Sequence, residues 1–183
     1  DQNSNSNQSE FAIYSIDSNI MRSINFTPLP GALEEAASIE RIANEKGFSV
    51  RSELGLFASE LNLRGIKSPN ILHLATHGFF ISQSSNPAEY ATLKFLSTDS
   101  SNNQFQNPMN RSGLLLAGAK YSQNLRSKGE LIDPENDGIL TAEEASKLDL
   151  SNTWLTVLSA CDTGSGVARA GEGVLGLRRA FAM

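Results

Sequence analysis

Three nearly continuous apolar runs constrain the fold of this chain more than any other feature of its sequence. They span Ile71–Thr76, 114–118 and Trp154–Ala160. Strands that are apolar throughout are typical of sheets covered on both faces, as in parallel α/β sheets. Amphipathic patterns that predict helices over 32–46 and near 53–64 precede the first run. This alternation predicts an α/β fold built on a mainly parallel sheet.

Shorter patterns predict the remaining elements. We expect a short strand at Phe48–Val50, a short helix from Thr141 and a last helix from about Glu172. The polar stretch 81–112 is too long for a simple connection, so we expect a surface insertion that flanks a site. The composition of residues 1–26 predicts a polar linker that follows another module and can include an edge strand. We expect residues 27–183 to form the domain itself.

Composition excludes several classes of function. The chain of 183 residues is 39% apolar and 19% charged, as a globular domain is, and its net charge of -5 disfavours nucleic acid or an anionic membrane as a direct partner. No apolar run approaches the ~20 residues that span a bilayer. The single cysteine cannot form an internal disulfide, which favours a reducing, cytoplasmic setting.

A histidine and the single cysteine each follow an apolar run. His77 and Gly78 come after the first run, and Cys161 after the last. Ligands of parallel sheets bind at the carboxyl ends of the strands, so both should lie on one edge of the sheet, although the pattern does not give the strand order. An imidazole can activate a thiol for nucleophilic attack, and the alternative is a small buried cysteine without chemistry.

Asp162-Thr163-Gly164 matches half of an aspartic protease site. That enzyme needs two such triplets and an all-β fold, whereas this chain has one triplet and alternates helix with strand. The simpler interpretation is a turn after the last strand.

The segment "DPENDGILTAEE" fits the calcium-binding loop of an EF-hand. The carboxylates at its ligand positions are Asp133, Glu135, Asp137 and Glu144. The stretch before it predicts no entering helix, however. A turn at Asp137-Gly138, followed by a capping box of Thr141 and Glu144, explains the same residues without a metal.

Two further patterns resemble cofactor and metal sites. Gly171, Gly173 and Gly176 have the spacing of a dinucleotide fingerprint, but they do not follow a strand directly. His73 and His77 would lie ~13 Å apart along a strand, too far for one metal ion, so His73 is expected to be a hydrogen-bonded core residue.

Taken together, several segments resemble successive blocks of the CHAT domain family, which is related to caspases and separases. They are "LPGALEEAASIERIA", "NILHLATHGFF", "GLLLAGA", "DGILTAEEASKLDLSNTWLTVLSACDTGSG" and "AGEGVLGLRRAF". The resemblance implies a caspase-like three-layer sandwich in which the strand of His77 lies beside the strand of Cys161. Members of the family continue into a further strand, so we expect the C-terminal part of the domain to be missing here.

The resemblance also implies a function and a site. It implies a cysteine endopeptidase with His77 and Cys161 as the catalytic dyad and the backbone N–H groups of Gly78 and Cys161 as the oxyanion hole, without a cofactor. The implied substrate is a protein or peptide, and the implied regulator is an attached sensor or repeat domain, often of TPR type, in a bacterial cytoplasm. Independently of the resemblance, the acidic residues Asp162 and Glu172 near the site would favour a basic substrate side chain, and the alternative is that a turn and a helix start are acidic for local reasons. A non-catalytic interaction domain of the same fold is the alternative.

Overall fold

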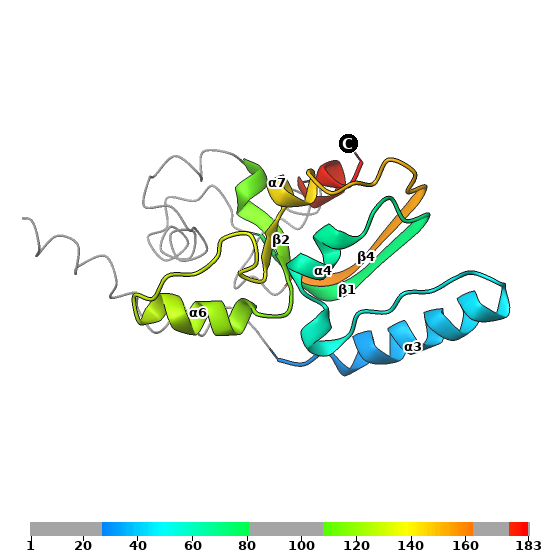
Figure 1. Ribbon diagram of the computed structural model, residues 1–183, viewed down its shortest axis with the longest axis horizontal. Helices are drawn as coiled ribbons and strands as arrows, with labels where there is room; N and C mark the ends of the chain where they lie inside the picture. Colours follow the sequence, from blue (N-terminus) through cyan, green and yellow to red (C-terminus); the bar gives the residue numbers. More distant parts are fainter. Residues whose placement is uncertain (1–26, 81–107, 163–175, 183) are drawn as a thin grey trace, which may run out of the picture.

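The computed structural model describes residues 27–80, 108–162 and 176–182 of the chain. A four-stranded sheet with the order β3-β2-β1-β4 lies at its centre (Figure 1). The strands are β1 (Ile71–Phe80), β2 (Ser112–Leu115), β3 (Ile139–Thr141) and β4 (Leu155–Asp162). Helices lie on both sides of the sheet, which confirms the predicted α/β class.

The expectation of a mainly parallel sheet was wrong. Strand β1 pairs in parallel with β4, but the pairs β1–β2 and β2–β3 are antiparallel. The four residues of β2 are all buried, and a strand buried on both faces is apolar whatever its direction. The apolar run at 114–118 therefore indicates that the strand is buried, but it does not indicate whether the strand is parallel or antiparallel to its neighbours.

The strands also end later than their apolar runs. Strand β1 continues through His77 and Gly78 to Phe80, because its ladder with β2 extends to the pair Phe80–Ser112. Strand β4 likewise includes Cys161. The prediction that these residues follow their strands was therefore wrong by a few positions. Strand β2, in contrast, ends before the predicted 118, since Gly118 adopts a φ of 101° and caps a helix.

The helix α3 (Pro30–Glu45) confirms the first predicted helix. The predicted strand at Phe48–Val50 is absent, and this segment is irregular. The second predicted helix is divided into a 3-10 turn, η1 (Gly55–Phe57), and a short α4 (Glu60–Gly65). Gly55 has a φ of 58°, which interrupts a helix, and the Ser59 side chain starts a new one by accepting from the N–H of Asn62.

This division changes which residues face the core. Three large apolar residues of the predicted second helix are exposed: Leu61 with 65% of its surface, and also Leu54 and Phe57. Leu63 and the carboxylate of Glu60 are buried instead. A helix that begins several residues later presents a different face to the sheet.

The helix α6 (Ala119–Ser127) was not predicted, because its sequence is polar. The short helix α7 (Ala142–Ala145) begins at the predicted capping box, in which Thr141 and Glu144 bond each other's backbone N–H groups. A short 3-10 helix, η3 (Pro108–Arg111), precedes β2. Residues 176–180 are helical, and the predicted start of this helix at Glu172 lies outside the described residues.

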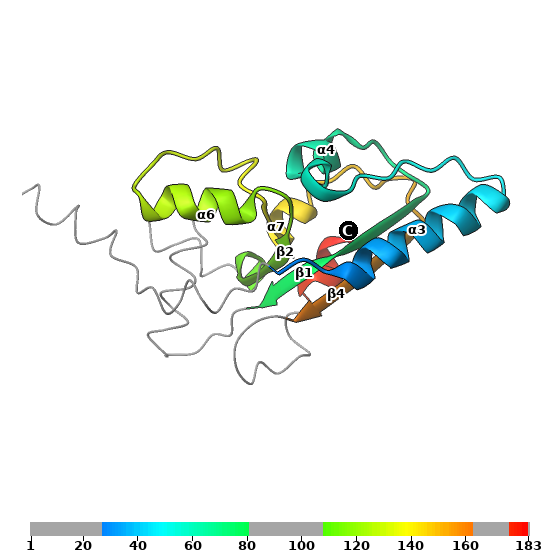
Figure 2. The same cartoon turned by 90° about the horizontal axis from the view of Figure 1, so that it is seen from below.

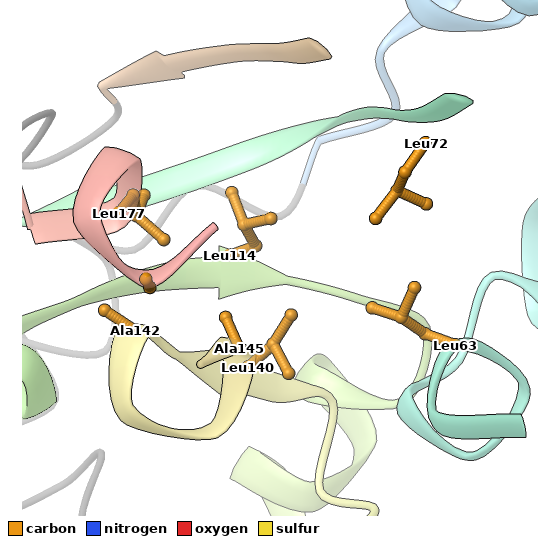
Figure 3. Packing of buried hydrophobic residues seen from close by; sticks show 8 residues of the cluster. Leu63, Leu72, Leu114, Leu140, Ala142, Ala145 and Leu177 are labelled. Atoms are coloured by element: carbon orange, nitrogen blue, oxygen red, sulfur yellow. The ribbon is translucent and has the colours of Figure 1, made fainter. Parts of the chain in front are cut away.

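The core lies on one face of the sheet, under α4, α7 and the helical residues 176–180 (Figure 3). Leu114 and Leu140 of the sheet are completely buried there. The cluster consists of Leu63, Leu72, Leu114, Leu140, Ala142, Ala145, Leu177 and Ala180. Of the described helices, none is long and apolar enough to cross a membrane.

The opposite face of the sheet carries α3. Figures 1 and 2 show this helix running beside β1 and β4, with α7 and residues 176–180 on the other side of the two strands. Side chains alternate between the two faces of a strand. Leu72 and Leu74 of β1 therefore contribute to the core, whereas His73 and His77 lie on the face that α3 covers.

Candidate active site

His77 and Cys161 are register partners on the neighbouring parallel strands β1 and β4. The adjacency of these two strands, which the sequence pattern left open and the family resemblance implied, is thus confirmed. Neighbouring strands lie about 4.8 Å apart, and the carboxyl ends of parallel strands meet at one edge of a sheet. The fold therefore brings the only cysteine of the chain beside one of its two histidines.

The imidazole of His77 is held in one orientation. The side chain is buried, with 8% of its surface exposed, and its Nε2 lies 2.7 Å from the backbone oxygen of Thr27. A carbonyl oxygen only accepts hydrogen bonds, so Nε2 must carry the proton. The neutral ring then has its lone pair on Nδ1, which is buried and has no hydrogen-bond partner among the described residues. This tautomer leaves Nδ1 free to accept a proton.

A second polar contact lies on the same face of the sheet. His73 Nε2 is 3.0 Å from Oε1 of Glu35 on α3, and Oε2 of the same carboxylate accepts from the hydroxyl of Ser159 on β4 at 2.8 Å. His73 is hydrogen-bonded, as the sequence predicted, but it is only half-buried and lies outside the core cluster.

The other predicted site residues are placed only in part. Gly78 is the register partner of Asp162, the last residue of β4, so both lie at the carboxyl ends of the paired strands. Glu172 lies outside the described residues, as do Thr163 and Gly164 of the triplet and Gly171 and Gly173 of the glycine pattern.

Two of the four calcium-loop carboxylates, Asp137 and Glu144, are engaged with protein groups. Asp137 forms an ion pair with Arg126 and accepts from the N–H of Ile139 at 2.7 Å. Glu144 closes the capping box and lies 3.3 Å from Arg64. Within the described ranges, no group of three or more His, Cys, Asp or Glu residues could hold a metal ion. The turn and cap interpretation therefore explains this segment.

A buried carboxyl group that the sequence patterns did not predict lies beside that turn. Glu60 of α4 is 0% exposed, and its carboxylate accepts from the N–H of Gly138 at 2.7 Å and lies 3.3 Å from Arg64. Burial, and to a lesser extent the charge of Asp137, raises the pKa of Glu60 to about 7. Burial also raises the pKa of Asp137, although Arg126 opposes this shift. The polar start of α4 after Ser59 was the only sequence signal for this arrangement.

The mixed sheet, its helices on both faces and the adjacent strands of His77 and Cys161 fit the caspase-like, peptidase-type domain that the sequence resemblance implies. A family model described as "CHAT domain" matches residues 2–183, and the chain belongs to this family. No curated protein matches the chain. No solved structure matches it either.

Proposed function

We propose that this chain is a cysteine endopeptidase that uses His77 and Cys161 as its catalytic dyad. The observation that supports the proposal most strongly is the register pairing of the two residues on β1 and β4. Register partners occupy the same face of a sheet, within reach of a proton transfer. The tautomer fixed by Thr27 adds to this support, because it directs the basic nitrogen of His77 away from the Thr27 carbonyl.

The proposed reaction has two stages. Nδ1 of His77 accepts the thiol proton as the sulfur of Cys161 attacks the scissile carbonyl, forming a C–S bond. The resulting imidazolium gives its proton to the leaving amine as the C–N bond breaks. Water then hydrolyses the thioester, again with His77 as base, and regenerates the thiol. The Nε2–H bond to Thr27 strengthens when the ring is charged, because a cationic donor bonds a carbonyl more strongly.

The backbone N–H groups of Gly78 and Cys161 are the proposed donors to the oxyanion. Preorganised N–H donors in such a site typically contribute about 3 kcal/mol to transition-state stabilisation. We further propose a protein or peptide substrate, for which Asp162 and Glu172 favour a basic side chain, and control by an attached sensor or TPR-type repeat domain. We also propose a bacterial cytoplasm as the location of the protein. A reducing compartment suits a chain with a single cysteine, because it has no internal disulfide to maintain.

The test is the pH dependence of Cys161 alkylation by iodoacetamide. Cys161 is the only cysteine, so all alkylation of the chain reports on this thiol. The dyad predicts a thiol that reacts well below the free-cysteine pKa of ~8.5 and loses this reactivity in His77→Ala. Cys161→Ala provides the blank. A profile near the free value that His77→Ala leaves unchanged would contradict the dyad and favour the non-catalytic interaction domain.

A further inference from the structure

The carboxylate of Glu35 joins three elements around the candidate site. It lies on α3 and contacts His73 of β1 through Oε1 and Ser159 of β4 through Oε2. An ionised carboxylate accepts at both oxygens, so both partners are donors. One side chain therefore connects the helix with both strands that carry the proposed dyad.

Both partners of Glu35 lie close in sequence to the dyad. His73 precedes His77 by four positions on β1, and Ser159 precedes Cys161 by two positions on β4. Even spacings on a strand place residues on the same face. The bridge through Glu35 therefore links β1 to β4 on the face that carries His77 and Cys161.

The same helix controls the partner of His77. Thr27 precedes the start of α3 at Pro30 by only three positions, so the placement of this helix governs whether the Thr27 carbonyl reaches Nε2. None of the sixteen residues of α3 is buried. Since apolar burial contributes little to holding α3, its directional bonds to the sheet carry more weight.

We propose that Glu35 is a positioning residue for the His77–Cys161 pair, an inference that rests on the proposed function. Glu35 holds β1 against β4 and holds α3 where the Thr27 carbonyl orients His77. It touches neither the substrate nor the reacting atoms, and it acts through the orientation of the imidazole.

The variant Glu35→Gln tests this role. The amide oxygen can accept from only one partner, and its NH₂ group can then donate to the other, but both contacts lose the carboxylate charge and are weakened. We expect the alkylation rate of Cys161 at pH 7 to fall about tenfold, with its pH midpoint displaced upward by about one unit. Glu34→Gln changes the exposed neighbouring carboxylate on the same helix and should leave the profile unchanged. Ser159→Ala removes only the β4 bond and should produce a smaller displacement in the same direction.

Introducing the same substitution into the His77→Ala variant distinguishes a positioning role of Glu35 from general support of the fold. In His77→Ala, Glu35→Gln should cause no further change in the alkylation profile, because its effect passes through the imidazole. A folded Glu35→Gln variant with the wild-type profile, or an equal loss in both backgrounds, would overturn the proposal. If Glu35→Gln does not fold, Ser159→Ala tests the proposal in its place. An alkylation profile of Ser159→Ala that equals the wild-type profile would then overturn the positioning role of Glu35. A wild-type profile that His77→Ala does not move would instead overturn the dyad itself, whatever the result for Glu35.

Discussion

The backbone carbonyl of Thr27 lies 2.7 Å from Nε2 of His77 and fixes the proton on that nitrogen. The contact joins the segment before α3 to the middle of the sheet. It uses a main-chain oxygen, so no side-chain substitution at position 27 removes the acceptor. The orientation of the imidazole thus depends on the path of the backbone and on the placement of α3.

The first prediction concerns this tautomer. Neutral His77 should carry its proton on Nε2, with Nδ1 unprotonated, because only this form donates to the Thr27 carbonyl. Long-range ¹H–¹⁵N correlation spectra of histidine-labelled protein at neutral pH would identify the two nitrogens. A spectrum with the proton on Nδ1 would contradict the structural assignment. His77→Gln serves to assign the resonances.

The second prediction concerns Gly138, at the turn beside Glu60. Its φ is 83°, and a Cβ at this position would collide with the backbone N of Ala119. Gly47 has a similar φ of 79° but open space around it. Gly47→Ala should therefore cost about 1 kcal/mol of unfolding free energy from backbone strain alone. Gly138→Ala should cost at least twice as much or prevent folding, as urea denaturation would show. Equal losses would refute the steric argument.

The third prediction follows from the raised pKa of Glu60, about 7 in the folded chain against 4.5 for the free group. The folded state binds this proton more tightly, so the stability linked to it is complete below pH 4.5. It is lost as the pH rises toward 7, by an amount on the order of 3 kcal/mol. Glu60→Gln should flatten this part of the stability profile, measured by urea denaturation at successive pH values.

The matched control for that experiment is Glu45→Gln. Glu45 is an exposed carboxylate on α3 that pairs with Arg41, so its removal should leave the slope of stability with pH unchanged. A Glu60→Gln variant that retains the full wild-type slope would show that another group is responsible for the pH dependence.

The fourth prediction concerns the buried ion pair of Arg126 and Asp137, whose side chains are 11% and 4% exposed. Arg126→Met leaves Asp137 without this cation and should cost about 3–5 kcal/mol of unfolding free energy. Adding Asp137→Asn should recover part of the loss, because the amide removes the charge and its oxygen can still accept from Ile139. The double variant is compared with both single variants by denaturation, and strictly additive losses would argue against direct coupling.

Local patterns in the sequence predicted local structure well. The capping box of Thr141 and Glu144 was recognised from two residues at a fixed spacing, and it forms as expected. The apolar runs likewise located three of the four strands. These signals depend on neighbours in the chain, so they can be interpreted without knowledge of the fold.

Features that depend on distant contacts were not predictable in the same way. The pairing of His77 with Cys161 is a matter of strand order, which no periodicity encodes. The polar helix α6 was missed because it buries Ser122 and Gln123 in place of apolar residues. The burial of Glu60 depends on a helix start at Ser59 and on a turn far along the chain at Gly138.

The parallel pairing of β1 with β4 also determines when the candidate site can exist during folding. These strands are far apart in sequence, with β2, α6, β3 and α7 between them. Contacts of such long sequence separation close late, because the entropy of a large loop must be overcome first. A partly folded or newly synthesised chain can therefore have His77 in place before the strand of Cys161 has docked. The proposed nucleophile and base meet only after the sheet is assembled, so an unfinished chain would lack the proposed proteolytic activity.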